Sequence, residues 1–150
     1  MAEDLKARLA EEIKVALKAG EKVRLGALRM LSASVKYREV EIRREVTDEE
    51  FLEVVGREVK QRKESAEAFA AAGRAELAEK EQQEQAVLEV YLPAQLSEGE
   101  TVALVDEAIA ATGAGGPGDL GKVMGYVMGK AKGRIDGGRV NALVRERLGT

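Results

Sequence analysis

The chain reads GKVMGYVMGKAKGRIDGGRVNALVRERL from Gly121 to Leu148. Apolar residues recur at helical spacing in both halves of this stretch, and the turn residues Asp136-Gly137-Gly138 separate them. Seven residues in the stretch are basic and only Asp136 and Glu146 are acidic, although the whole chain has a net charge of -3. A local excess of cations beside small residues suits a phosphate backbone or a closely packed helix. The stretch therefore predicts two helices with a binding surface rather than an active site.

Three glycines of this stretch, Gly121, Gly125 and Gly129, lie one helical turn apart. Each costs about 0.8–1 kcal/mol relative to alanine inside a helix, so three on one stripe indicate a need for close approach. Two kinds of neighbour fit equally well: a helix of the same domain, either the one after Gly113 or the one after Gly138, or an external RNA backbone or partner helix.

The candidate RNA-binding residues are the cations of the same stretch. Lys130 and Lys132 alone have a simpler explanation, because cations near a helix C-terminus complement its dipole. Together with the arginines further along, however, they predict a basic surface. The candidates are Lys122, Lys130, Lys132, Arg134, Arg139, Arg145 and Arg147.

Two absent residue types restrict the chemistry of the chain. It has no cysteine, which excludes disulfides, thiolate nucleophiles and sulfur-ligated metals. It has no histidine, the commonest general base at neutral pH and the commonest transition-metal ligand. We therefore expect no catalytic residues, no metal site and no cofactor.

The overall pattern predicts an all-α fold with two domains. Apolar residues make up 45% of the 150 residues and charged residues 34%, and no segment alternates for long like a half-buried strand. In the first domain, residues 1–94, we expect four long helices. The first carries an apolar face of Leu5, Leu9, Ile13 and Leu17 and ends at Gly20.

The other helices are marked by their caps. We expect a second helix over residues 21–44, a third from the capping box of Thr47 and Glu50 to Gly73, and a fourth over residues 74–92. The second domain, residues 95–150, is expected to be a compact three-helix unit. Its first helix begins at the capping box of Ser97 and Glu100 and ends at Gly113, Asp119 is placed to cap its second helix, and the third follows Asp136.

Two further patterns receive structural explanations. Gly113, Gly115 and Gly118 match a GxGxxG pattern, but a helix rather than a strand precedes them, so we expect an inter-helix loop. The basic runs within residues 36–44 and 57–63 alternate with glutamates at helical spacing, which is typical of solvated helix faces.

The location of the protein is predicted from hydropathy. No run of eighteen apolar residues is present, and the acidic, amphipathic start of the chain lacks the apolar core of a signal peptide. We therefore expect a cytoplasmic protein without a membrane contact. Few asparagines, no cysteine and much glutamate and arginine favour a thermophilic source.

Long stretches of the chain resemble the YqeY-like proteins of the GatB/YqeY family. In the first domain these are LGALRMLSASVKYREVE (25–41), GREVKQRKES (56–65), AGR (72–74) and VLEVYLPAQLS (87–97). From about Ser97 the chain resembles the tail domain of the B subunit of tRNA-dependent amidotransferases, above all in the glycine-rich stretch from Gly121 to Leu148.

The resemblance implies a helical first domain, a three-helix tail and an RNA partner. In the amidotransferase the tail engages tRNA, while a separate domain performs the chemistry. We therefore expect a non-catalytic accessory protein that binds tRNA or another structured RNA. The alternatives are a protein-interaction adaptor or small oligomer, and, less favoured, a subunit-like role in glutamine-dependent amide transfer. For the last, a carbon–nitrogen ligase label would come from the family name alone.

Overall fold

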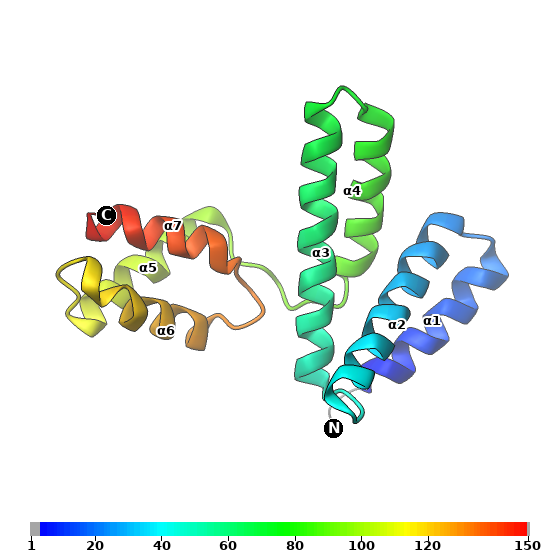
Figure 1. Cartoon of the computed structure of the whole chain (residues 1–150), viewed down its shortest axis with the longest axis horizontal. Helices are drawn as coiled ribbons and strands as arrows, with labels where there is room; N and C mark the ends of the chain where they lie inside the picture. Colours follow the sequence, from blue (N-terminus) through cyan, green and yellow to red (C-terminus); the bar gives the residue numbers. More distant parts are fainter. Residues whose placement is uncertain (1–3, 150) are drawn as a thin grey trace. The chain divides into compact units, whose positions relative to one another are not determined.

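A computed structural model describes residues 4–149 of the chain. Within that range all regular structure is helical and no strand occurs, which confirms the predicted all-α fold. The chain divides into two compact units, residues 1–92 and 93–150 (Figure 1). No helix in residues 4–149 combines the length and the apolar character needed to cross a membrane.

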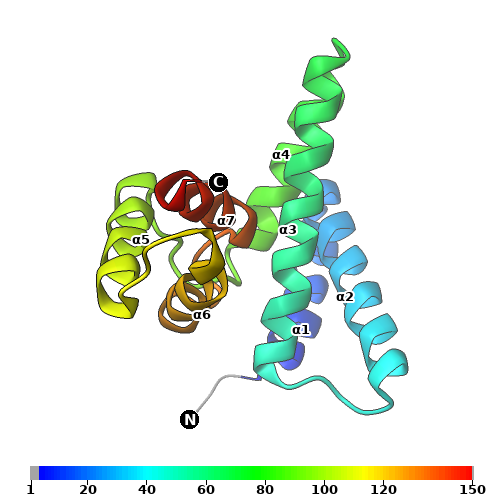
Figure 2. The same cartoon turned by 60° about the vertical axis from the view of Figure 1, so that its left-hand side comes forward.

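The N-terminal unit consists of two helical hairpins. Its helices are α1 (Leu5–Ala19), α2 (Lys22–Ile42), α3 (Asp48–Ala71) and α4 (Ala75–Glu89). Figures 1 and 2 show α3 and α4 side by side, with α2 packed between this pair and α1. Gly20 ends α1 with a left-handed backbone, and the predicted capping box of Thr47 and Glu50 starts α3.

The core of this unit joins all four helices. Its fully buried large side chains come from α2, α3 and α4: Leu28, Leu31, Phe51, Val55 and Leu88. The expectation that Leu17 faces the core is wrong, because Leu17 is 55% exposed. Ala16 is fully buried in its place. The strict four-residue repeat drifts around a helix of 3.6 residues per turn, so its last member leaves the buried face.

A polar contact fixes the end of α4 against α1. The Tyr91 hydroxyl donates a hydrogen bond to a Glu12 carboxylate oxygen at 2.6 Å, and the Arg8 guanidinium lies 4.6 Å from the centre of the Tyr91 ring. Burial and the bond to Glu12 raise the pKa of Tyr91. Burial alone would raise the pKa of Glu12, but hydrogen bonds from Tyr91 and Arg8 outweigh it and lower that pKa.

A second polar cluster lies between α3 and α4. Arg62 is 7% exposed, and its guanidinium faces three carboxylates. Its nitrogen atoms lie 3.2 Å from Glu58, 3.5 Å from Glu81 and 3.5 Å from Glu84. The Ser34 hydroxyl of α2 donates to Glu58, which extends the cluster to a third helix.

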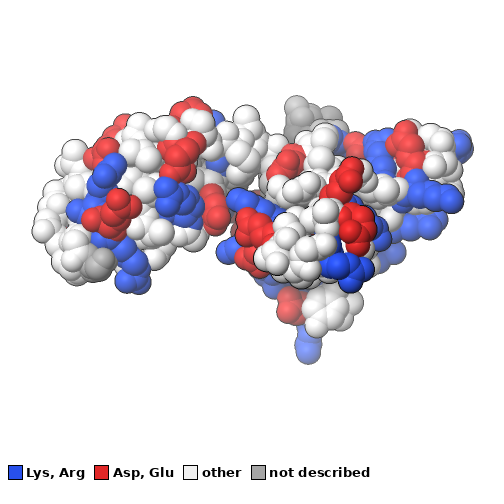
Figure 3. Space-filling model, turned by 90° about the horizontal axis from the view of Figure 1, so that it is seen from above, with Lys and Arg blue, Asp and Glu red and all other residues white. Residues whose placement is uncertain are grey.

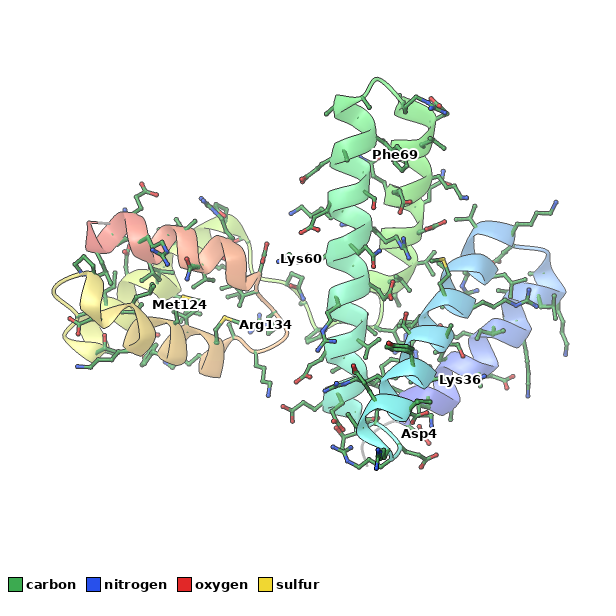
Figure 4. All side chains as sticks on the ribbon, in the orientation of Figure 1. Asp4, Lys36, Lys60, Phe69, Met124 and Arg134 are labelled. Atoms are coloured by element: carbon green, nitrogen blue, oxygen red, sulfur yellow. The ribbon has the colours of Figure 1, made fainter. Side chains whose placement is uncertain are left out.

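The C-terminal unit packs three helices around one apolar core. They are α5 (Glu98–Thr112), α6 (Leu120–Lys130) and α7 (Gly137–Leu148), with a short 3-10 turn, η1 (Pro117–Asp119), before α6. Figure 4 shows Met124 between the ribbons of α6 and α7. Six side chains of this core are at most 1% exposed: Val105, Ala108, Val123, Val127, Val140 and Val144.

The helix caps of this unit follow the sequence with one exception. Ser97 and Glu100 form the predicted capping box, and Gly113 ends α5 in a left-handed conformation. Asp119 does not cap α6 through its side chain, so that expectation is wrong. Its carboxylate instead accepts the N–H of Gly115 at 3.0 Å, because the intervening 3-10 turn brings it back over the glycine-rich loop.

Candidate nucleic-acid interface

The three glycines of α6 lie on its solvent face. At about 100° per residue, Gly121, Gly125 and Gly129 are opposite Val123 and Val127, which are fully buried. No atom lies within 4 Å of a Cβ built on any of the three glycines. Packing against another helix of this unit therefore does not explain them, and the stripe leaves the helix backbone open to an outside partner.

Two of the three arginines of α7 form ion pairs with α5. Arg139 pairs with Glu98, with its Nε at 3.0 Å from one carboxylate oxygen, and the Nε of Arg147 lies 3.0 Å from Asp106. The partners in both pairs are 41 residues apart, so α5 and α7 run parallel and in register. These two cations thus face carboxylates of their own unit.

Lys130 is also partnered. Its Nζ lies 3.1 Å from a Glu107 carboxylate oxygen and 5.0 Å from the centre of the Tyr126 ring. The Tyr126 hydroxyl donates to the same Glu107 at 3.2 Å. Hydrogen bonds with Tyr126 and Glu107 raise the pKa of Lys130, and the bond from Lys130 lowers the pKa of Glu107.

Arg134 has a structural position in the loop between α6 and α7 (Figure 4). Its Nε donates to the Ala94 carbonyl at 2.9 Å, and its own carbonyl accepts the Leu96 N–H at 2.8 Å. The Gln95 side chain donates to the Gly133 carbonyl at 2.8 Å. Hydrogen bonds with the segment before α5 therefore hold this loop in place, and Arg134 takes part in two of them.

The remaining candidates lie around α6 and on α7. Lys122 has a side chain that is 69% exposed and lies 3.8 Å from Asp119. Lys132 is exposed just beyond the end of α6. Arg145 donates to Asn141 of the same helix at 2.7 Å. Lys122 is the candidate next to the glycines along α6.

On the face that Figure 3 shows, the cations of the C-terminal unit form no continuous patch. Seven acidic and seven basic residues make this unit electrically neutral. In the view of Figure 3, basic and acidic side chains alternate over it. Over the visible surface of α1 and α2, by contrast, lysine and arginine predominate.

The comparison with protein families covers nearly the whole chain. A family model described as Yqey-like protein matches residues 6–148. The chain belongs to the YqeY-like family. No curated protein matches this YqeY-like chain significantly.

The sequence did not single out Tyr126 as part of the site in this YqeY-like protein. Its ring lies on α6 at four-residue spacing from Lys122 and Lys130, and it contacts the latter. This four-residue spacing is the sequence feature that could have placed Tyr126 beside the two lysines. In the part of the chain that the structure describes, no group of acidic side chains is arranged to hold a metal ion.

Proposed function

We propose that this YqeY-like protein is a non-catalytic accessory protein that binds tRNA or another structured RNA through its C-terminal unit. The solvent face of α6 carries the proposal. Gly125 in the interior of α6 costs stability, and nothing within the unit occupies the space above it or above Gly121 and Gly129 near the helix ends. A phosphate backbone can approach such a bare face more closely than any face that carries side chains.

The cations around this face would supply the phosphate contacts. Lys122 lies beside the glycine stripe and Lys132 just beyond its end. Surface ion pairs contribute about 0–1 kcal/mol, so Lys130, Arg139 and Arg147 can exchange their carboxylate partners for phosphates at little cost. Because the unit is neutral overall, we expect moderate affinity and contacts directed by RNA shape rather than by base identity.

The resemblance of the C-terminal unit to the amidotransferase tail supports the same partner. That tail engages tRNA, and the strongest part of the resemblance is the segment that forms α6 and α7. None of the candidate residues is assigned a chemical step. Amidation of misacylated tRNA by the purified chain alone would contradict the non-catalytic part of the proposal.

Fluorescence anisotropy of a labelled tRNA tests the proposal. Binding to the wild-type chain should fall steeply between about 50 and 150 mM salt. In the double variant Lys122→Gln/Lys132→Gln, the plot of log affinity against log salt should become shallower, with the magnitude of its slope lower by about 2. Arg134 is left intact because it fastens the loop to Ala94. An unchanged slope would remove these lysines from the interface.

A protein-interaction role is the alternative, and the neutrality of the C-terminal unit favours it. Dedicated RNA binders are often strongly basic, whereas a bare helix face can equally receive another helix. Recovery of a partner that survives nuclease treatment, together with no tRNA binding at either salt, would select this alternative.

A further inference from the structure

The helix α2 exposes a second apolar stripe opposite its buried one. Its buried residues are Ala27, Leu28, Leu31 and Val35. On the other side, six small or apolar residues follow one another at alternating spacings of three and four. They are Val23, Gly26, Met30, Ala33, Tyr37 and Val40.

Most of this stripe is open to solvent, although the Met30 sulfur lies 3.8 Å from a guanidinium nitrogen of Arg62. The exposed fractions of Val23, Met30, Tyr37 and Val40 are 38%, 47%, 73% and 77%. No atom lies within 4 Å of a Cβ built on Gly26, which is exposed like Ala33. Alternating spacings of three and four produce the seam that packs against another helix in a coiled coil, and the small residues allow close approach.

The stripe lies between two of the neighbours of α2, namely α1 and α3. On one side, Glu39 pairs with Lys6 of α1 at 2.8 Å. On the other side, Ser34 contacts Glu58 of α3. From Val23 to Val40 the stripe extends for about 25 Å, at 1.5 Å per residue, which is long enough for about five turns of a partner helix.

A row of cations follows one edge of the stripe. Lys22, Arg29 and Lys36 are seven residues apart, and each directly precedes an apolar member of the stripe. Figure 4 shows Lys36 on α2. These three side chains are exposed and make no close ion pair within residues 4–149, although Lys36 is near enough to Glu39 to help lower the pKa of that carboxylate. Arg24 and Arg38, which lie off this edge, pair with Glu21 and Glu41.

We propose that this face of α2 binds an acidic amphipathic helix of a partner protein. The apolar side of that helix would cover the stripe, and its Asp or Glu residues would face Lys22, Arg29 and Lys36. Opposite charges at such flanking positions set partner choice and orientation in helix pairs. This site lies in the N-terminal unit and does not depend on RNA binding by α6.

A second copy of the chain fits the face poorly. In an antiparallel pair of α2 helices, the cationic edges would face each other. In a parallel pair, Lys22, Arg29 and Lys36 would face the residues five positions further along the other copy. Those residues are Ala27, Ser34 and Glu41, and only one of them is acidic. RNA phosphates could use the cations but would leave the four large apolar side chains without a partner.

A synthetic peptide tests the proposal on the full-length protein. The probe is a fluorescein-labelled, end-blocked peptide of three heptads, with leucine at the two seam positions and glutamate at the flanking positions. The matched probe carries lysine in place of those glutamates. The glutamate peptide should bind the wild-type chain at least about tenfold more tightly than the lysine peptide, because of charge complementarity.

Charge reversal on α2 should invert this preference. Arg29→Glu/Lys36→Glu should weaken binding of the glutamate peptide by about tenfold or more and improve binding of the lysine peptide. Lys60→Glu/Lys63→Glu on α3 makes the same change of charge at exposed positions and should leave both affinities unaltered. Tyr37→Ser/Val40→Ser should weaken both peptides without unfolding the chain, because both side chains are largely exposed.

Three results would overturn the proposal. The first is no binding of the glutamate peptide, or binding that Arg29→Glu/Lys36→Glu leaves unchanged. The second is a stable dimer in light scattering that Tyr37→Ser/Val40→Ser dissociates, which would make a second copy the occupant. The third is tRNA binding that the α2 charge reversal abolishes while the glutamate peptide does not bind, which would assign the cations to nucleic acid.

Discussion

Gly125 and Val127 lie on opposite faces of α6: Val127 is fully buried, whereas no atom lies within 4 Å of a Cβ built on Gly125. The buried side of the helix is thus constrained by the fold, and the glycine side is not. Stability alone would favour alanine at Gly125, since alanine is the better helix former. No contact within the C-terminal unit explains a glycine at this position, and the proposed RNA contact would explain it.

The first prediction concerns stability. Gly125→Ala should raise the free energy of unfolding by about 0.5–1 kcal/mol, because the helical backbone accepts a Cβ and the space above it is empty. Gly113→Ala is the contrasting variant: its φ of +68° is left-handed, so the same substitution should destabilise by about 1 kcal/mol. Urea denaturation followed by circular dichroism measures both. A destabilising Gly125→Ala would show that this face is already occupied.

The second prediction concerns the buried Arg62. Arg62→Met should cost roughly 3–5 kcal/mol, because it leaves three largely buried carboxylates without their cation. The neighbouring Lys63 is exposed, so Lys63→Met should change stability by no more than about 0.5 kcal/mol. Equal effects of the two substitutions in chemical denaturation would contradict the structural role of the cluster.

The third prediction concerns acid stability. A hydrogen bond from Arg44 and one from the Thr47 backbone lower the pKa of Glu50 from 4.5 to about 2. A lowered pKa in the folded state stabilises above the ordinary pKa, and this contribution is lost as the pH falls from 4.5 towards 2. Glu50→Gln keeps an oxygen for the Thr47 N–H but removes the charge. It should be less stable than wild type at pH 7, and the difference should shrink below pH 4.5.

Glu53→Gln is the matched control, because Glu53 is exposed on the same helix and makes no ion pair in the described range. Thermal unfolding at a series of pH values measures all three proteins. A stability difference between wild type and Glu50→Gln that stays constant down to pH 2 would refute the assignment to the Glu50 charge.

The fourth prediction rests on the proposed RNA contact. Glu107→Gln should increase tRNA affinity by about two- to fivefold at low salt, because Lys130 loses its carboxylate partner and becomes available to phosphate. Glu79→Gln on α4 removes the same charge from an exposed position of the other unit and should have no such effect. If both variants gain affinity equally, the net charge of the chain rather than Lys130 is responsible.

Much of the fold could be predicted from local signals. Short sequence patterns correctly predict several helix ends. Capping boxes at Thr47 and Ser97 start α3 and α5, and left-handed glycines at Gly20 and Gly113 end α1 and α5. Asp119 shows the limit of such patterns, because the 3-10 turn redirects its carboxylate to Gly115. A single 3-10 turn before a helix thus changes which backbone N–H donates a hydrogen bond to the side chain of the residue that precedes the helix.

The arrangement of the candidate site could not be predicted from the sequence to the same extent. Within residues 121–148, basic residues far outnumber acidic ones, so the sequence of this stretch predicts a basic surface. The acidic residues that pair with Arg139 and Arg147, however, lie 41 residues earlier in the chain. Only the parallel packing of α5 and α7 brings these acids and arginines together. The exposed stripe of α2 was hidden for a different reason. A helix with two apolar faces has no single polar side to identify, although the seven-residue spacing of Lys22, Arg29 and Lys36 was visible.

The most direct test of RNA binding by the C-terminal unit is a steric one. Gly125→Leu places a large neutral side chain on the bare face of α6, while Ala68→Leu does the same at an exposed position of α3 in the N-terminal unit. We predict that tRNA binding, measured by anisotropy at low salt, falls at least about tenfold in the first variant and is unchanged in the second. Equal affinity of Gly125→Leu and wild type would contradict the claim that RNA lies against the glycines of α6.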